Sequence, residues 1–137
     1  AITNGIGNVK GVLMAEVSID IDKEREFATI TIKGDVEAGD LDAVLEKYFG
    51  NSPCMATIYD SSEGSWSNLS TDFFRRMVDK SKPLSRKGAK TAMVFSNQVN
   101  FGIGRMIESN CDLAGYENEI ECFYRLEDAR EWVCNRS

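Results

Sequence analysis

The chain has 137 residues, with 16 Lys and Arg, 22 Asp and Glu and no His, which gives a formal net charge of −6 at pH 7. The absence of histidine excludes nucleophile–histidine catalytic pairs, histidine-ligated zinc or haem, and an imidazole that titrates near neutral pH. The acidic balance, with basic residues not gathered into one block, argues against nucleic acid or an anionic membrane surface as a partner, because such binding neutralises phosphate charges with Lys and Arg.

Length and composition predict a single globular domain over residues 1–137. Hydrophobic residues make up 42% of the chain and charged residues 28%, as in ordinary folded domains. Apolar stretches are only a handful of residues long, and no basic flank precedes an apolar N-terminal region. We therefore expect no membrane span, no signal peptide and a cytoplasmic location. The first residue is Ala1 rather than Met, which indicates a processed or trimmed N-terminus.

Four cysteines are spread along the chain, at Cys54, Cys111, Cys122 and Cys134. No two of them have the Cys-x-x-Cys spacing of many metal and redox sites. Cys54 and Cys122 lie in apolar runs, where a thiol usually behaves as a small hydrophobic group. We expect free and mostly buried thiols, with no metal site and no cofactor.

An N-terminal β-hairpin is predicted from two strand-like segments, residues 12–19 and 27–33, which a charged connection separates. In the second segment Ala28, Ile30 and Ile32 alternate with polar residues. This period of two is typical of a half-buried antiparallel strand.

A helix, a buried strand and a polar loop are predicted next. Apolar residues from Leu41 to Tyr48 recur at helical spacing after Asp40, the predicted N-cap. Residues 54–59 are apolar on both faces, as in a central parallel strand. Residues 61–68 are rich in Ser and Gly and predict a loop.

From residue 69 onward the pattern alternates between helix and strand. The predicted segments are a helix from Leu69 to Lys82 capped by Asn68 or Ser70, a buried strand at 91–95, a helix from Asn100 to about Asp112, a strand at 120–124 and a closing helix at 126–133. The order β-β-α-β-α-β-α-β-α predicts an α/β fold, with helices packed on a mostly parallel sheet that has an antiparallel edge strand. In such sheets ligands bind outside the carboxyl ends of the strands.

The first candidate site follows the third predicted strand, at Asp60, Ser61 and Ser62. Serine hydroxyls on an exposed turn beside a helix N-terminus can receive a phosphate group, whose charge interacts favourably with the helix dipole. The alternative is a polar turn in which these side chains satisfy local backbone groups.

The strand order, the acid-Ser-Ser-x-Gly sequence at 60–64 and the terminal Leu-Glu-Asp-Ala-Arg-Glu-Trp-Val helix together resemble STAS domains. The chain is most similar to their SpoIIAA-like, STAS/SEC14-type branch. The resemblance implies a regulatory module like the anti-sigma-factor antagonists, with a regulatory kinase or an anti-sigma-like protein as partner. In those proteins the second Ser of an Asp-Ser-Ser-Gly turn is phosphorylated, which corresponds to Ser62 here; Ser61 is the neighbouring candidate. Glu63 is inserted relative to that pattern.

The second candidate site runs from the end of the fourth predicted strand into the next helix. It contains Asn97, Phe101 and Arg105, and it resembles an aromatic-Gly-x-x-Arg-like stretch in the same branch. Arg105 is placed to pair with a carboxylate or phosphate at the helix start. Alternatively, Gly102 and Gly104 permit tight packing of the helix on the sheet, with Arg105 bridging to an acid such as Asp60. The Gly-x-Gly sequence lacks a full nucleotide-binding fingerprint.

Trp66 occupies a polar segment, where an aromatic side chain either marks a binding surface or folds back onto the core. With Phe74, Phe101 and Arg105 it predicts an apolar pocket with an anion anchor at the carboxyl ends of the third and fourth predicted strands. The candidate residues for binding a ligand or partner are Asp60, Trp66, Phe74, Asn97, Phe101 and Arg105.

Two functions are consistent with these patterns. The leading hypothesis is a non-enzymatic module that acts through protein–protein interaction, switched by serine phosphorylation. The alternative is a SEC14-like domain that binds a small apolar or anionic molecule or a lipid. An enzyme using Asp60 as a phosphoacceptor, as receiver domains do, is not expected, because Arg125 stands where a receiver needs Lys. The hairpin edge and apolar helix faces offer surfaces for a homodimer.

Overall fold

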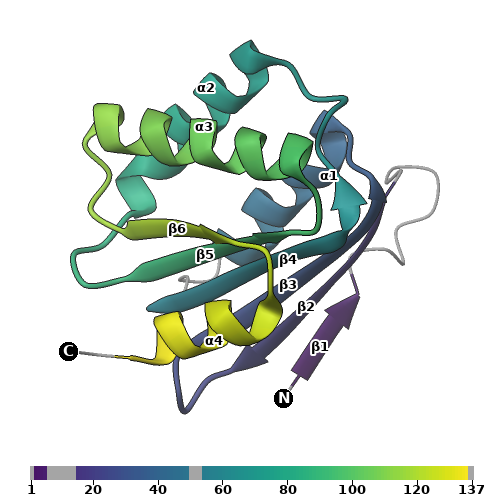
Figure 1. Cartoon of the computed structure of the whole chain (residues 1–137). Coiled ribbons are helices and arrows are strands. Elements are labelled where there is room, and N and C mark those ends of the chain that lie inside the picture. The colour runs from purple at the N-terminus through teal and green to yellow at the C-terminus, as the bar shows by residue number, and fades with distance from the viewer. Residues whose placement is uncertain (1, 6–14, 50–53, 136–137) are drawn as a thin grey trace.

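The computed structural model in Figure 1 describes residues 2–5, 15–49 and 54–135. Within these ranges the sheet has six strands in the order β1-β2-β3-β4-β5-β6. The strands are β1 (Ile2–Gly5), β2 (Glu16–Asp22), β3 (Phe27–Asp35), β4 (Ala56–Ser65), β5 (Lys90–Phe95) and β6 (Glu119–Phe123). The helices are α1 (Ala38–Val44), continued by the π-helix η2 (Leu45–Phe49), α2 (Thr71–Ser81), continued by the 3-10 helix η3 (Lys82–Leu84), α3 (Gln98–Ala114) and α4 (Leu126–Cys134).

The sheet confirms the predicted fold class. Strands β2 and β3 form the antiparallel hairpin, and β3 to β6 are mutually parallel. The predicted first strand is shifted, since β2 ends at Asp22, and residues 12–14 of that prediction lie outside the described residues. Strand β1, which pairs antiparallel with β2, was not predicted.

The helices lie in two layers, one on each face of the sheet (Figure 1). From β3 to β6 the sheet grows in one direction, so right-handed crossovers place α1, α2 and α3 on the same face. Helix α4 follows the last strand and packs on the other face, against β4, β5 and β6. Each face therefore has its own core.

The larger core lies under α1, α2 and α3, and the smaller one under α4. On β3 the fully buried Ala28, Ile30 and Ile32 point into the larger core, as their alternation predicted. The smaller core is built from Ala56, Ile58, Ala92, Val94, Ala129 and Val133. Successive residues of β4 and β5 therefore serve opposite faces.

Most of the segment predicted as a loop at 61–68 is a strand, because β4 continues to Ser65. Beyond a register shift, the last three residues of β4 pair with residues 33–35 of β3. Gly64 permits this close pairing, since a Cβ there would lie 2.8 Å from the carbonyl oxygen of Ile32. Strand β5 ends opposite Ser61, so the end of β4 extends beyond it.

Two predicted N-caps are wrong by a few residues. Helix α1 begins at Ala38, and Asp40 lies in its first turn, where its carboxylate accepts a 2.8 Å hydrogen bond from the backbone N–H of Glu37. Helix α3 is capped by Asn97, whose side-chain oxygen accepts from the N–H of Asn100 at 2.9 Å. An acid or amide in the first turn can bond back to the cap as readily as a cap bonds forward, so sequence spacing does not distinguish them. The Ser70 cap of α2 is confirmed.

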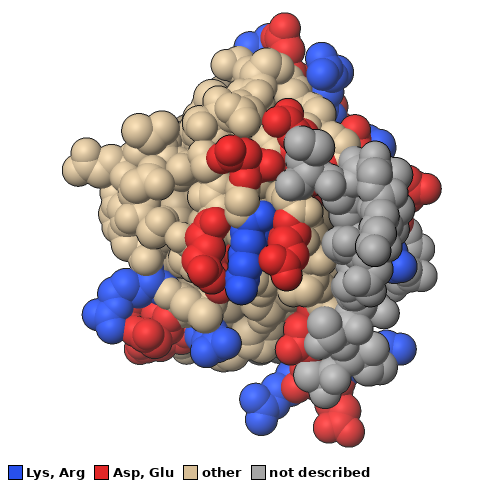
Figure 2. Space-filling model, turned by 90° about the vertical axis from the view of Figure 1, so that its right-hand side faces the viewer, with Lys and Arg blue, Asp and Glu red and all other residues tan. Residues whose placement is uncertain are grey.

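Charges of both signs are intermixed on the side of the molecule shown in Figure 2. The sheet pairs show the same mixing: Lys33 lies opposite Glu16 on β2 and 3.6 Å from the carboxylate of Glu63 on β4. The described residues therefore form no continuous basic patch on this side.

Candidate functional site

The predicted phosphorylation site lies within the extended end of β4 rather than on a turn. The Ser62 hydroxyl donates a 2.7 Å hydrogen bond to the carboxylate of Asp60, which also accepts from the Ser62 backbone N–H at 3.1 Å. Both side chains are half-buried. Helix α2 begins only at Thr71, so Ser62 does not sit at its N-terminus.

Ser61 points to the opposite face of β4 and is fully buried. Its hydroxyl oxygen accepts a 2.9 Å hydrogen bond from the indole N–H of Trp66. The backbone N–H of Trp66 donates to the side-chain oxygen of Asn100 on α3, at 2.7 Å. Ser61 and Asn100 thus hold Trp66 in place, and phosphorylation of Ser61 would require this packing to open.

Trp66 is folded into the larger core, with 2% of its surface exposed. Its ring stacks on Phe74 of α2, with ring centroids 6.2 Å apart, and meets Phe95 of β5 edge to face at 5.5 Å. Of the two alternatives for Trp66, the structure therefore has the side chain packed on the core. Phe74 is 1% exposed and belongs to the same core.

The second predicted site does not converge with the first. Asn97 caps α3, and Phe101 stacks on Tyr124 with ring centroids 4.1 Å apart. Arg105 is exposed, and the ion pairs of the described residues include none between Arg105 and Asp60, so the predicted bridge is not formed. Asp60 lies on the α4 face of the sheet two residues after Ile58, whereas α3 covers the other face.

The two glycines of α3 differ in what surrounds them. A Cβ at Gly104 would lie 2.6 Å from the Phe95 ring and 2.8 Å from the sulfur of Cys122, which confirms tight packing of the helix on the sheet. Gly102 has nothing within 4 Å of such a Cβ, so packing does not require it to be glycine.

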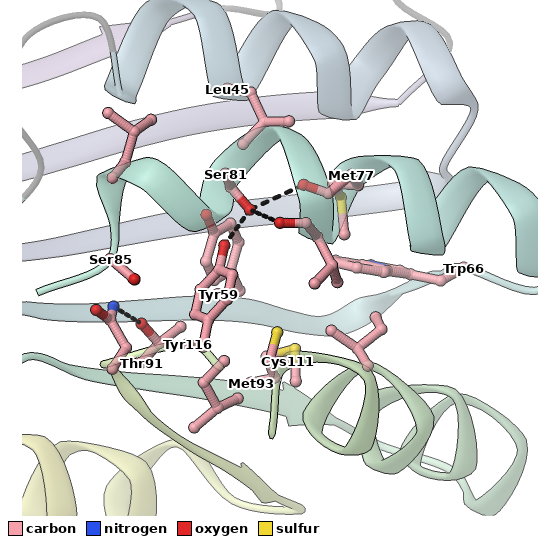
Figure 3. Close-up of a pocket in the computed structure, with 15 residues that line it drawn as sticks. Leu45, Tyr59, Trp66, Met77, Ser81, Ser85, Thr91, Met93, Cys111 and Tyr116 are labelled. Carbon is pink, nitrogen blue, oxygen red and sulfur yellow. Dashed lines mark hydrogen bonds between the residues drawn. The ribbon is translucent and has the colours of Figure 1, made fainter. Parts of the chain in front are cut away.

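The structure contains an apolar cavity of about 70 Å³ between α2, α3 and the sheet (Figure 3). We call it the α2–α3 cavity. It lies toward the amino ends of β5 and β6, where Thr91 and Ile120 are neighbours in the sheet. Its lining residues are Leu45, Tyr59, Trp66, Met77, Val78, Ser81, Leu84, Ser85, Thr91, Met93, Ile107, Cys111, Tyr116, Asn118 and Ile120. Of the residues that formed the predicted pocket, only Trp66 lines it.

The polar groups of the α2–α3 cavity are hydroxyls, the Asn118 amide, the Trp66 indole N–H and the Cys111 thiol, and none of its described lining residues is charged. The Ser81 and Tyr116 hydroxyls are hydrogen-bonded to each other, and the Ser81 hydroxyl also donates to the Met77 carbonyl at 2.8 Å (Figure 3). Near Ser85, the side-chain amide of Asn118 donates to the Thr91 hydroxyl at 3.2 Å. The cavity therefore presents apolar walls with few polar atoms, most of which already have partners.

Burial raises the pKa of three ionisable groups that line this cavity. The pKa of Tyr59 is well above its usual value, and those of Tyr116 and Cys111 are raised to about 12. Desolvation is the main cause in each case, because an apolar environment disfavours the charged form. All three groups are therefore neutral at pH 7.

The thiols are free, as expected: Cys111 and Cys122 are buried, Cys54 is half-buried and Cys134 is exposed. The described residues contain no group of three or more His, Cys, Asp or Glu side chains that could hold a metal ion. None of the described helices is both long enough and apolar enough to cross a membrane.

The sequence patterns missed most residues of the α2–α3 cavity. Tyr59 and Met93 lie in runs that predicted ordinary buried strands, and Ser81 lies at the predicted end of a helix. Tyr59 keeps part of its surface accessible although it belongs to the sheet, because its ring borders the cavity. A tyrosine within a run of buried strand residues is the one sequence signal for a polar group at this depth.

Neither the protein-family models nor the curated proteins compared with the chain match it. Among solved structures, the chain is similar to the crystal structure of an uncharacterized protein of the DUF3478 family from Shewanella loihica PV-4, described as having a SpoIIAA-like fold. The TM-score is 0.57 at 14% sequence identity, and the similarity covers 88% of this chain and 96% of that chain. The present chain has a SpoIIAA-like fold, as the sequence resemblance implied.

Proposed function

We propose that this protein is a non-enzymatic binding module whose ligand is a small, uncharged and mainly apolar molecule held in the α2–α3 cavity. The observation that carries the proposal is the cavity itself, about 70 Å³ of space with apolar walls. Protein interiors are packed closely, and apolar side chains that border unfilled space lose van der Waals contacts on that side. A ligand that fills the space gains those contacts.

The lining limits the chemical class of the ligand. No Lys or Arg of the described residues lines the cavity to pair with an anion, and no Asp or Glu to pair with a cation. An ionised ligand would therefore be desolvated without compensation. Thr91, Asn118 and Ser85 can bond one uncharged head such as a hydroxyl, while Leu84, 40% exposed, lies at the edge where the cavity meets the surface.

The same lining supports a binding role rather than catalysis. A nucleophile or general base must be available in its reactive form near the working pH. Burial keeps Cys111 as a thiol and Tyr116 as a phenol, since both pKa values are raised to about 12. Ser81 is bonded to backbone carbonyls and to Tyr116, and no carboxylate, amine or guanidinium group of the described residues is hydrogen-bonded to it.

The proposal is tested with n-alkanols from butanol to decanol and with the matching alkanoates as charged probes. Thermal unfolding and native mass spectrometry would be recorded for the wild-type protein and for Cys111→Met, which extends a side chain into the cavity. We expect saturable stabilisation by alkanols, little by alkanoates, and loss of the alkanol effect in Cys111→Met. The control is Leu113→Met, at a position of α3 that is 87% exposed.

Two results would contradict this function. One is that no alkanol stabilises the wild-type protein in a saturable way. The other is that Cys111→Met, while folded, responds to alkanols as the wild type does. Either result would show that the α2–α3 cavity does not bind these ligands.

A second candidate function, a protein-binding module switched by phosphorylation of Ser62, is favoured by the contact between Ser62 and Asp60. A phosphate on Ser62 would place about −1.5 to −2 charges beside a carboxylate that now accepts a hydrogen bond. The resulting repulsion would loosen the end of β4, where a partner such as a kinase-regulated protein would bind. In this second candidate function, the phosphate on Ser62 acts by repelling the carboxylate of Asp60 and not by interacting with a helix dipole.

Hydrogen exchange tests the switch. Ser62→Asp should speed amide exchange at residues 61–65, because it introduces a second carboxylate next to Asp60. Ser62→Ala is the matched control, since it removes the hydroxyl without adding charge. Equal exchange in the two variants would contradict the switch, and so would a native-host protein that carries no phosphate on Ser62 under any growth condition.

A further inference from the structure

We propose that the free edge of β6 binds an extended cationic peptide, which adds to the sheet as a further strand. Strand β6 (Glu119–Phe123) is the last of the sheet and pairs with β5 on one side. No strand of the described residues pairs with its other side. Figure 1 shows β6 at this edge, with α3 above it and α4 below it.

The backbone of β6 has hydrogen-bonding groups directed away from the sheet. The N–H of Glu119 donates to the carbonyl of Ala89 at 2.9 Å and so faces β5. Backbone groups of successive residues in a strand point to alternate sides, so those of Ile120 and Cys122 face outward. Such an edge can accept another strand through main-chain hydrogen bonds, the mode by which many domains bind extended peptides.

An open acidic groove of about 560 Å³ runs beside this edge. It is formed by α3, the segment before β6, β6 itself and Trp132 of α4. Five of its lining residues are acidic and none is Lys or Arg. These acidic residues are Glu108, Asp112, Glu117, Glu119 and Glu121. The groove thus complements a cationic segment.

One carboxylate oxygen of the groove lacks a donor. Oε2 of Glu108 is buried and accepts no hydrogen bond from the described residues. A buried polar atom without a partner is costly, and an N–H group of a bound peptide would supply the missing donor. The pKa of Cys122 on β6 is raised to about 12, mainly by burial and secondly by the negative charge of Glu108. Glu108 therefore lies close to β6.

The charge selects among possible occupants. A second copy of this chain would bring its own Glu119 and Glu121 against the same residues, and like charges on paired strands are destabilising. A nucleic acid or an anionic membrane surface carries the same sign of charge as the groove. A cationic peptide is the occupant for which both the backbone and the side chains are complementary.

The spacing of the acidic residues defines the peptide further. Glu119 and Glu121 are two residues apart on one strand, so their side chains lie on the same face. A peptide strand paired with β6 presents alternate residues on that face. Basic residues at every second position therefore meet Glu119 and Glu121.

The test uses a fluorescent heptapeptide of alternating Lys and Val, with Lys at both ends, titrated with the full chain and followed by fluorescence anisotropy. A second peptide of the same sequence, N-methylated at every internal residue, keeps the charge and lacks the backbone donors. We expect the methylated peptide to bind at least about tenfold more weakly. Equal affinity of the two peptides would overturn strand addition, because it would show attraction by charge alone.

Charge reversal locates the site. Glu119→Lys/Glu121→Lys should weaken binding of the unmethylated peptide at least about tenfold. The matched control is Asp72→Lys/Asp79→Lys, which changes net charge equally at exposed positions of α2. Equal loss in both double variants, with circular dichroism showing both folded, would overturn the assignment to β6. The proposal would also be overturned if sedimentation velocity showed a dimer that Glu119→Lys/Glu121→Lys abolishes and the control variant does not. A second copy of the chain would then occupy the edge of β6.

Discussion

The two ends of the sheet use their side chains in opposite ways. At the carboxyl end of β4, Asp60, Ser61 and Trp66 are hydrogen-bonded within the chain, and the aromatic groups are closely packed. Toward the amino ends of β5 and β6, mostly apolar residues leave a cavity of about 70 Å³. The end of the sheet that is richer in polar residues in the sequence is therefore the more closely packed of the two. Polar residues beside a strand end can mark a place where the chain satisfies its own backbone and side-chain groups.

Trp66 belongs to both regions, because its indole N–H donates to Ser61 and its backbone N–H donates to Asn100, while its ring also lines the α2–α3 cavity. The contrast between the two ends therefore depends on this one side chain. Substitutions at Trp66 and its partners probe the packed end, and those that alter the cavity probe the other.

Trp66→Ala should have the largest effect on stability. It removes a side chain that is 2% exposed and joins its volume to the existing cavity, which should lower the free energy of unfolding by about 3–5 kcal/mol. Urea denaturation measures the change. The control is Trp132→Ala, at a half-buried position on α4, which should cost less. A loss at Trp66 no larger than that at Trp132 would contradict the role of Trp66 as the centre of the packed end.

The neighbouring serines should differ although they have the same chemistry. Ser61→Ala leaves the buried indole N–H of Trp66 without an acceptor and should cost about 1–3 kcal/mol. Ser62→Ala removes a hydrogen bond that is only partly buried and should cost less than about 1 kcal/mol. The two variants are compared by the same urea denaturation. Equal costs would show that the two hydroxyls are equally important to the fold.

Local patterns predicted the elements of this fold well, because each depends on periodicity within a short segment. The alternation at Ala28, Ile30 and Ile32 and the helical spacing up to Tyr48 reflect burial on one face. The end of β4 could not be predicted in this way. Its Ser and Gly residues are typical of a loop, and it is a strand because β3 pairs with it over a bulge near Thr31.

The candidate site depended on positions distant in the chain, which the sequence patterns did not reveal. The faces of Asp60 and Arg105 are set by the pairing of β4 and by the packing of α3, and they place the two residues on opposite sides of the sheet. The α2–α3 cavity joins Leu45, Tyr59, Ser81 and Tyr116. The volume of the cavity depends on how these side chains pack together, and the hydrophobic periodicity of a short segment does not predict that packing.

Alanine substitutions at the two glycines of α3 test how closely this helix packs on the carboxyl ends of the strands. Gly104→Ala should cost about 1–3 kcal/mol, because its Cβ would press on the Phe95 ring and on the sulfur of Cys122. Gly102→Ala should instead stabilise the protein by up to about 1 kcal/mol, since alanine favours the helix and nothing lies within 4 Å. Thermal unfolding of both variants gives the comparison. A stabilising Gly104→Ala would show that this end is loosely packed.

The pH dependence of stability probes the cavity end, and its expected effect is the smallest. In the folded chain the pKa of Cys111 is raised from 9.0 to about 12, mainly by burial, so the folded state holds this proton more tightly than the unfolded state. The resulting stability is fully present below pH 9 and is lost as the pH rises from 9 toward 12. Between pH 9 and pH 10 the loss should be on the order of 1 kcal/mol for this thiol.

Cys111→Val isolates that contribution, because valine has a similar size and does not titrate. Its free energy of unfolding should fall less steeply between pH 9 and pH 10 than that of the wild type, while the exposed Cys134→Ala should leave the slope unchanged. Identical slopes in all three proteins would mean that water reaches Cys111 through the cavity and already solvates the thiolate. The cavity would then be a water-filled opening, and the contrast between a packed polar end and an apolar, partly unfilled end would fail.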